Sequence, residues 1–258
     1  MNIEMRAKKS LGQHFLKSER ALNKIVEAGE ITPEDTILEI GPGTGILTRK
    51  LLETGAKVIA VEKDDELYEN LRQELVSPKL ELIHSDILDF IENSKLEIIN
   101  YKLIANIPYN ITGAILEKFL SAENQPEKMV LLLQREVAKR IVGGKESVLS
   151  ISVKAYGKPL YIETVRAGSF VPMPQVDSAI IAIEDISKEF FGKFSEKDFF
   201  RLLKAGFASK RKKLSSNLAN IFDKELVLRT FHELGIDENA RAEDVPVEMW
   251  GELASRML

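Results

Sequence analysis

The segment NIPYNIT, residues 106–112, follows the apolar run YKLIA with no spacer and carries side chains that suit chemistry better than a core. Asn106 offers an amide oxygen, and Tyr109 offers a flat ring. Pro108 holds its φ angle near −65°, which sets the direction of the neighbouring carbonyl groups. The segment therefore predicts two fixed oxygen acceptors beside an aromatic surface.

Two such acceptors suit an exocyclic amine such as N6 of adenine, whose lone pair is delocalised into the ring. Accepting both hydrogens draws the nitrogen towards tetrahedral geometry, and no strong base is then needed. The rate would come from alignment and electrostatics. A base stacked on Tyr109 gains about 1–3 kcal/mol. The alternative for these residues is a plain turn with a buried tyrosine.

A glycine-rich turn, EIGPGTG at residues 39–45, lies between a predicted strand and a predicted helix. Gly41 and Gly43 allow a ligand to approach the backbone closely. The spacing G-x-G-x-G departs from the G-x-G-x-x-G of dinucleotide binders and from the phosphate-binding P-loop, and no lysine follows it. The turn thus predicts a ligand with little negative charge.

Two acids follow neighbouring strands, Glu62 after the second and Asp86 after the third. Ligands of open α/β sheets bind beyond the carboxyl ends of the strands, so these acids should share one crevice with Gly41 and Asn106. Glu62 would accept hydrogen bonds from ribose hydroxyls, and Asp86 from an adenine amine. Each acid alone could be a solvated strand end. Together with the glycine turn they predict S-adenosylmethionine as the cofactor.

Short apolar strands alternate with helical segments over the first two thirds of the chain, which predicts a doubly wound α/β sheet. The predicted strands are residues 36–40, 57–62, 80–86, 101–106, 128–134, 160–165 and 178–184. From about Ser187 the pattern is helical. We predict a methyltransferase domain over residues 1–188 and a small α-helical RNA-binding domain over residues 189–258.

The composition describes an ordinary globular protein, with 44% hydrophobic and 29% charged residues in a chain of 258. There is no cysteine, which excludes disulfides and a catalytic thiol, and the three histidines lack metal-ligand spacing. We expect no metal. No long apolar run and no secretory signal are present, so we expect a cytoplasmic protein without a membrane span.

Basic residues are concentrated although the net charge is −4. The segment 201–213 contains six basic residues and no acid: Arg201, Lys204, Lys210, Arg211, Lys212 and Lys213. We predict that they contact RNA phosphates, the alternative being an ordinary solvated face. A second candidate patch consists of Arg135, Lys139 and Arg140.

Several motifs occur in the order found in one known family. NIPY resembles the [ND]-x-P-Y motif of amino-methyltransferases that modify exocyclic nitrogens. The isoleucine at position 107 of this motif is similar to that of the rRNA adenine dimethyltransferases among them. The supporting segments are KKSLGQHFL (8–16), EIGPGTGILT (39–48), SFVPMPQVDSAI (169–180), FASKRKKLSSNL (207–218) and RAEDVPVEMWGELA (241–254). From Lys8 to its end, the chain resembles the KsgA/RsmA family of small-subunit rRNA adenine-N6 dimethyltransferases.

This resemblance implies a class I methyltransferase sheet, Rossmann-like and mostly parallel, with an antiparallel last strand. It implies dimethylation of two adjacent adenosines in the 3′-terminal hairpin loop of 16S rRNA, within an immature 30S subunit, by a monomer. It also implies that His14 and the backbone at Leu16 contact the cofactor, and that Phe170 sandwiches the base opposite Tyr109. The cofactor residues that match the family are Gly41, Gly43, Glu62, Asp86 and Asn106.

Three alternatives remain at this stage. A 23S rRNA adenine dimethyltransferase would share NIPY and the aromatic-proline loop, although the VDSA and RAEDVPVE segments favour the small-subunit enzyme. A non-catalytic ribosome-assembly factor could have the same fold, but Asn106 and the glycine turn are intact. A small-molecule N-methyltransferase would leave the basic segment at 201–213 without a purpose.

Overall fold

The computed structural model describes residues 8, 12–94 and 98–258, so residues 9–11 of the motif at 8–16 lie outside the described part. The chain divides into two compact units. The first comprises Met1–Ala138 and Pro159–Ile186, and the second comprises Lys139–Lys158 and Ser187–Leu258. The second unit therefore takes in residues 139–158, which the predicted boundary at 188 places in the first domain.

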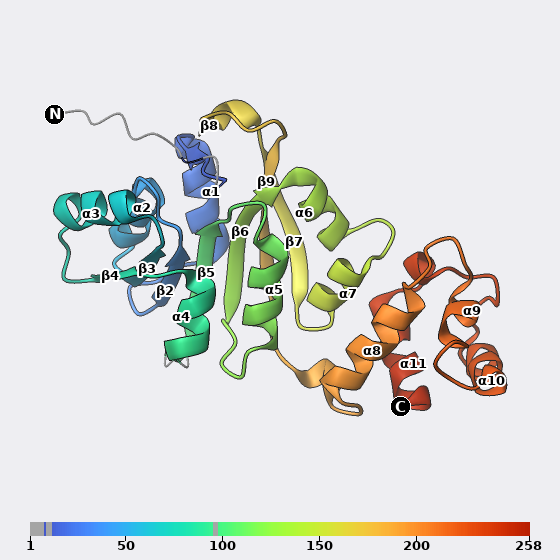
Figure 1. Cartoon of the computed structure of the whole chain (residues 1–258). Helices are drawn as coiled ribbons and strands as arrows, with labels where there is room; N and C mark the ends of the chain where they lie inside the picture. The colour runs from blue at the N-terminus through green and yellow to red at the C-terminus, as the bar shows by residue number, and fades with distance from the viewer. Residues whose placement is uncertain (1–7, 9–11, 95–97) are drawn as a thin grey trace. The chain divides into compact units, whose positions relative to one another are not determined.

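The first unit is built on a mixed sheet (Figure 1), as predicted. Within the described residues the sheet has seven strands, in the order β4 (Leu80–His84), β3 (Lys57–Glu62), β2 (Thr36–Ile40), β5 (Tyr101–Asn106), β6 (Lys128–Gln134), β9 (Ser178–Glu184) and β7 (Lys158–Val165). The pairs from β4 to β6 are parallel, and β9 runs antiparallel to β6. The expected reversal of the last strand is confirmed.

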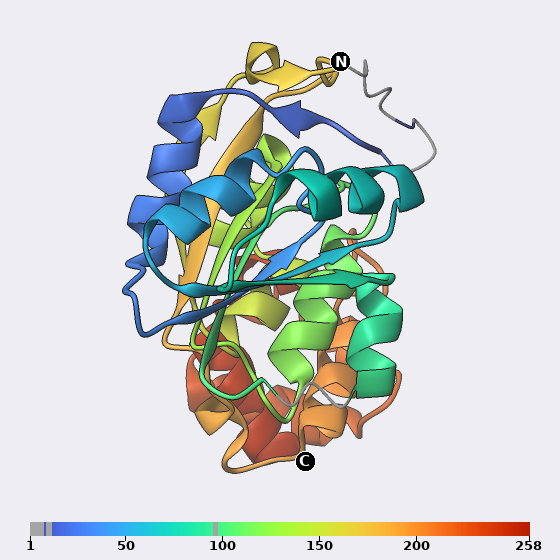
Figure 2. The same ribbon diagram turned by 90° about the vertical axis from the view of Figure 1, so that its left-hand side faces the viewer.

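Helices cover both faces of this sheet (Figure 2). One face carries α1 (Glu19–Gly29), α2 (Ile46–Glu53) and α3 (Asp65–Glu74), and the other carries α4 (Ile87–Ser94) and α5 (Thr112–Ser121). Because both faces are covered, the central strands are almost continuously buried and read as apolar runs. Ser18 caps the beginning of α1, because its hydroxyl accepts a hydrogen bond from the Ala21 N–H (3.3 Å).

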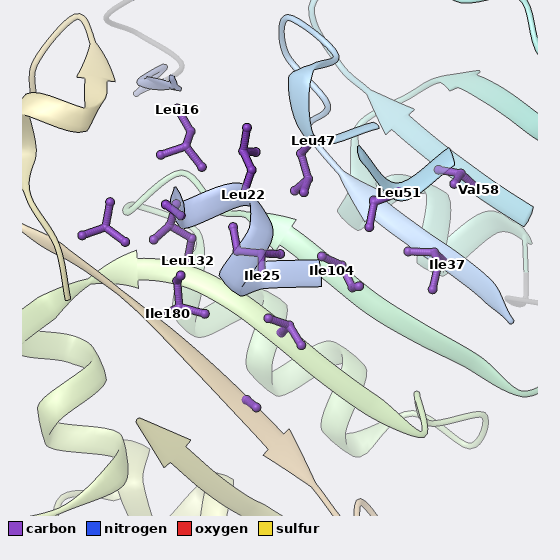
Figure 3. Packing of buried hydrophobic residues seen from close by; sticks show 14 of the residues in the cluster. Leu16, Leu22, Ile25, Ile37, Leu47, Leu51, Val58, Ile104, Leu132 and Ile180 are labelled. Atoms are coloured by element: carbon purple, nitrogen blue, oxygen red, sulfur yellow. The ribbon is translucent and has the colours of Figure 1, made fainter. Parts of the chain in front are cut away.

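The core under α1 and α2 joins residues that are far apart in the sequence (Figure 3). Leu22 and Ile25 of α1 are buried against strand residues such as Ile104 and Leu132. The buried face of α1 thus holds the helix against the central strands. This packing fixes the strand ends that carry Glu62 and Asn106.

A short antiparallel ribbon lies beside the same core. It pairs β1 (Phe15–Leu16) with β8 (Phe170–Val171), opposing Phe15 to Val171 and Leu16 to Phe170. The 3-10 turn η2 (Ala167–Ser169) precedes β8, and the Lys17 N–H donates to the Ser169 carbonyl (2.8 Å). The ribbon therefore links the N-terminal segment to the proline loop.

The second unit is helical and has its own core. It contains α7 (Val148–Lys154), α8 (Glu196–Gly206), α9 (Leu214–Leu218), α10 (Lys224–Leu234), α11 (Val247–Met257) and the turns η3 (Glu189–Phe191) and η4 (Ala242–Asp244), while α6 (Arg135–Val142) crosses from the first unit. Trp250 is fully buried and donates its indole N–H to the Val245 carbonyl (3.1 Å). Ile151 and Ala155 belong to the same cluster, which is why residues 139–158 group with this unit.

Candidate active site

The predicted cofactor residues line one cavity at the carboxyl edge of the parallel strands. Its lining includes His14, Leu16, Gly41, Gly43, Glu62, Asp86, Asn106, Pro108 and Tyr109. They come from the ends of β2, β3, β4 and β5 and from the N-terminal segment. Strand order explains the gathering, because β4, β3, β2 and β5 are successive neighbours whose carboxyl ends meet at one edge.

Glycines shape the floor of this cavity. Gly43 has φ of +60°, and a Cβ there would lie 3.1 Å from the Phe15 ring, so a larger residue would be strained in its backbone and crowded against that ring. At Gly41 a Cβ would meet no atom of the described residues within 4 Å. The backbone at Gly41 is therefore open on the side where a side chain would otherwise project, as close contact with a ligand requires.

Glu62 is held rigidly at the end of β3. Its carboxylate accepts hydrogen bonds from the Gly43 N–H (3.0 Å) and the Asp64 N–H (2.9 Å), one on each oxygen. Each oxygen keeps a second lone pair, which is the capacity that two ribose hydroxyls need. Burial raises the pKa of Glu62, and the backbone N–H groups of Asp64 and Gly43 act against that rise.

Asp86 is a charged acceptor at the end of the loop after β4. Burial would raise its pKa, but hydrogen bonds from Lys63 (2.6 Å) and the Leu88 N–H (2.9 Å) outweigh burial and lower it. The carboxylate is thus ionised at neutral pH and can accept a hydrogen bond from an amine. Lys63 lies against the same group, so it balances the charge.

Asn106 has a defined orientation. Its Nδ2 donates to the His14 carbonyl (3.1 Å), so the N-terminal segment engages the amide nitrogen. The side-chain oxygen Oδ1 remains as the acceptor, as the sequence predicts for an amine substrate. The segment thus contributes to the reaction centre by fixing which end of the amide is available.

His14 lies at the cavity and makes two contacts with other parts of the chain. Its Nδ1 lies 2.8 Å from the Pro172 carbonyl, which can only accept, so the Nδ1 hydrogen is used there. The centroid of its ring lies 5.9 Å from that of the Tyr109 ring, and the planes of the two rings make an angle of 26°. The contact of His14 with the cofactor stays a prediction.

Tyr109 is half-buried and anchored by its hydroxyl, which lies 2.8 Å from the Ser178 hydroxyl on β9. Burial raises the pKa of Tyr109, and the Asp177 carboxylate adds to the rise. The phenol therefore stays neutral and serves as a ring and a hydrogen-bonding group. This anchoring holds the reaction centre against the strand that follows the proline loop.

The comparisons with known proteins decide the family. The family described as "Ribosomal RNA adenine dimethylase" matches residues 4–257. The chain belongs to this family. Ribosomal RNA small subunit methyltransferase A from Dehalococcoides mccartyi is 44% identical, covering 96% of this chain and 88% of that protein. The protein of the same name from Nostoc sp. is 39% identical, covering 97% and 98% respectively.

Solved structures agree with this placement. A dimethyladenosine transferase from Plasmodium falciparum has a TM-score of 0.80 at 27% identity and covers 93% of this chain and 96% of that chain. The 23S rRNA methyltransferase ErmE has a TM-score of 0.76 at 25% identity and covers 94% and 99%. This dimethylase is accordingly an S-adenosylmethionine-dependent rRNA adenine dimethyltransferase with a class I methyltransferase fold.

Phe170 does not join the other predicted residues of this dimethylase. Its side chain is only 2% exposed and packs in the core with Leu16 and Leu22, and Phe170 is not among the residues that line the cavity. The physical reason is the pairing of β8 with β1, which turns Phe170 inwards. The ring is therefore not exposed in the cavity beside Tyr109, and the sandwich of a base between the two rings stays a prediction.

Glu39 is a cavity residue that the sequence motifs did not single out. It is 1% exposed, and its Oε2 has no hydrogen-bond partner within the described part of the chain. Burial raises the pKa of Glu39 to about 8, and the charge of Glu62 adds to the rise. An acid in an otherwise apolar strand, directly before a glycine turn, is the sequence signal that could have identified it.

The predicted RNA-contacting side chains lie on the helical unit of the dimethylase. Arg201 and Lys204 are on α8, Lys210–Lys213 precede α9, and all six side chains are exposed. None of these six forms an ion pair with a described residue. On α6, Lys139 and Arg140 are also exposed, whereas Arg135 pairs with Asp177 (2.7 Å).

The described residues contain no group of three or more His, Cys, Asp or Glu side chains that could hold a metal ion. They also contain no helix with the length and apolar character needed to cross a membrane.

Proposed function

We propose that this enzyme dimethylates N6 of two adjacent adenosines in the 3′-terminal hairpin loop of small-subunit rRNA. The single observation that carries the proposal is the orientation of Asn106, whose amide nitrogen is engaged by the His14 carbonyl and whose oxygen is thereby left to accept from an amine. The names of the relatives at 44% and 39% identity support the small subunit as the source of the rRNA.

The cavity has the chemistry that S-adenosylmethionine requires. Glu62 would bind the ribose hydroxyls, Asp86 the adenine amine, and the open backbone at Gly41 would contact the ligand closely. Oε2 of the buried Glu39 has no hydrogen-bond partner among the described residues, and a cationic ligand would satisfy it. When bound, S-adenosylmethionine supplies an electrophilic methyl group on a sulfonium.

The chain's own groups would prepare the acceptor nitrogen. Oδ1 of Asn106 accepts one N6 hydrogen, and the Ile107 carbonyl, held by Pro108, accepts the other. The Pro108 carbonyl instead accepts the Ile111 N–H (3.2 Å), which closes the turn. Tyr109 stacks on the base and restricts its orientation. The proton leaves after the nitrogen has become positively charged, so no strong base is required.

We further propose that the substrate is an immature 30S subunit, that the enzyme acts as a monomer and that it works in the cytoplasm. An unpaired loop adenosine enters a pocket without the cost of leaving a duplex, which is a few kcal/mol. The specific alternative is 23S rRNA, because the fold of ErmE is similar over 94% of the chain. The two candidates differ in the rRNA that is labelled.

The test is to incubate the enzyme with labelled S-adenosylmethionine and with small or large subunits that lack the modification. We expect label in the small-subunit rRNA, and primer extension that stops at two adjacent adenosines near its 3′ end. Label confined to 23S rRNA would establish the alternative. No label in either rRNA would contradict the proposed function.

We propose that the six exposed cations of the helical unit bind RNA phosphates. A variant with Lys210→Gln, Arg211→Gln, Lys212→Gln and Lys213→Gln should bind small-subunit RNA on the order of 10- to 100-fold more weakly. The slope of log K against log salt concentration should become less negative by about 2–3, because each phosphate contact to a single strand contributes about 0.7 to that slope. Filter binding over a salt series measures both quantities.

A matched control neutralises four other exposed cations of the same unit: Lys193, Lys197, Lys224 and Arg229. It should retain most of the affinity, and both variants should bind S-adenosylmethionine as the wild type does. Equal loss in the two variants would show a general charge effect and would contradict the assignment of the segment 210–213.

A further inference from the structure

A second groove lies on the methyltransferase unit, beyond the ribbon of β1 and β8. Three arginines and three hydroxyl side chains contribute to its lining: Arg20, Arg135 and Arg166, with Ser18, Thr164 and Ser169. They come from the beginning of α1, the start of α6, the end of β7 and the connection between β7 and β8. Neither the catalytic proposal nor the basic segment of the helical unit includes this groove.

The groove opens at the same edge of the sheet as the reaction centre. Gln134 at the carboxyl end of β6 pairs with Ser178 at the start of β9, and the groove residues Arg135 and Asp177 directly adjoin that pair. Ser178 is also the residue that binds the Tyr109 hydroxyl (2.8 Å). The groove therefore begins one residue away from the anchor of the tyrosine on which the target base would stack.

The two acids of the groove are engaged in holding its walls. Asp177 accepts the Ala167 N–H on Oδ1 (3.0 Å) and pairs with Arg135 through Oδ2 (2.7 Å), which fastens the connection before β8 to α6. Glu163 pairs with Arg20 (2.9 Å). Their charges are thus balanced by these two arginines, and neither acid repels an incoming anion strongly.

Arg166 is the arginine that this arrangement leaves available. Its side chain is exposed and forms no ion pair or hydrogen bond with the described residues. The hydroxyl of Ser169 lies on the same short connection and adds a neutral donor. A guanidinium beside hydroxyl groups is the donor set that proteins use for the phosphates of nucleic acids.

The surface next to the groove suits a strand with unstacked bases. Val171 and Met173 follow on the proline loop and are 52% and 68% exposed, so they present apolar surface beside the groove. Apolar side chains that contact base faces beside cationic groups that contact phosphates are typical of single-stranded RNA sites. A free phosphate ion would use the cation but would have no need of the apolar surface.

We propose that this groove binds the backbone phosphates of the RNA strand that flanks the target adenosine, with Arg166 as its principal contact. The inference rests on the proposed function, since it requires an RNA strand whose target base occupies the reaction centre next to this groove. It adds an RNA contact on the methyltransferase unit itself, next to the proline loop. Such a contact would hold the strand in register with Tyr109 while the base is inserted.

The test compares Arg166→Gln with the wild type in binding to a hairpin RNA that carries the two adjacent adenosines. We expect Kd to rise about 3- to 10-fold and the salt slope to flatten by about 0.7, which is one phosphate contact. With small subunits as substrate, KM should rise while kcat and the Kd for S-adenosylmethionine stay unchanged. Arg166→Lys keeps the charge and should recover most of the affinity.

Arg72→Gln is the matched control, because Arg72 is an exposed arginine of the same unit on α3 and should leave RNA binding unchanged. Unchanged Kd and slope in Arg166→Gln would overturn the inference. So would inorganic phosphate that binds the wild type through Arg166 while RNA affinity is the same in both proteins. Methylation of small subunits by the wild type, measured on the same preparation, tests the proposed function separately.

Discussion

Asn106→Ala should reduce the rate of adenosine methylation by a factor of about 10² to 10³ or more. The substitution removes Oδ1, one of the two acceptors for the N6 hydrogens, and it also removes the bond from Nδ2 to the His14 carbonyl (3.1 Å). The lost contact with the N-terminal segment should weaken S-adenosylmethionine binding only modestly. Initial rates at saturating substrates, together with calorimetric titration of the cofactor, separate the two effects.

Asn110→Ala is a matched control for this prediction. Asn110 also lines the cavity and lies on the same loop, but it is exposed and its side chain makes no hydrogen bond with described residues. Its replacement should leave the rate within a few-fold of the wild type. Asn106→Asp restores an oxygen acceptor but places a carboxylate near the His14 carbonyl, so an intermediate rate is expected. A fully active Asn106→Ala enzyme would end the proposed mechanism.

Glu39→Gln should stabilise the enzyme without cofactor, and increasingly so as the pH rises. Burial raises the pKa of Glu39 from its ordinary value of 4.5 to about 8, so between these values the folded state holds a proton that the unfolded state has released. Stability then falls as pH rises through that window, by on the order of 4 kcal/mol in total. Glutamine has no proton to lose, so its advantage should be small near pH 5 and largest near pH 8.

Urea unfolding at pH 5, 6.5 and 8 measures this difference in the free energy of unfolding. Glu53→Gln is the control, because Glu53 is exposed on α2 and should show little pH dependence relative to the wild type. A difference between Glu39→Gln and the wild type that does not change from pH 5 to pH 8 would contradict a buried, protonated Glu39. If the cofactor binds the Glu39 carboxylate, saturating S-adenosylmethionine should reduce the difference in the free energy of unfolding between Glu39→Gln and the wild type.

The strands and the turn that build the cavity could be predicted because their causes are local. The strands at 36–40, 57–62 and 101–106 have the predicted bounds, since apolar β-branched runs that end at glycine or polar residues mark buried strands. Parallel connection through helices then requires the strand ends to meet at one edge. Gly43, Glu62, Asp86 and Asn106 therefore come together for reasons already present in the order of the residues.

Other features depend on contacts between segments that are distant in the sequence. Lys8 and Gln13 bind the Asp64 carboxylate (2.9 and 3.2 Å), which caps α3, and no local pattern indicates that partnership. Arg135, which belongs to the second candidate patch for RNA, pairs with Asp177, 42 positions away. The pairing of Leu16 with Phe170 accompanies burial of the Phe170 ring, whereas the sequence of the proline loop alone does not show whether that ring is buried or exposed.

The sequence by itself determined the α/β architecture, the antiparallel reversal implied by the family, the glycine turn and the identity of the acids and amide at the strand ends. The tertiary structure decided which of these groups is available for chemistry: within the described part of the chain the Asn106 oxygen has no partner, the Phe170 ring is buried, and Arg166 forms no ion pair. The physical reason is that residue type sets what a side chain can bind, whereas its availability depends on partners brought close only by packing.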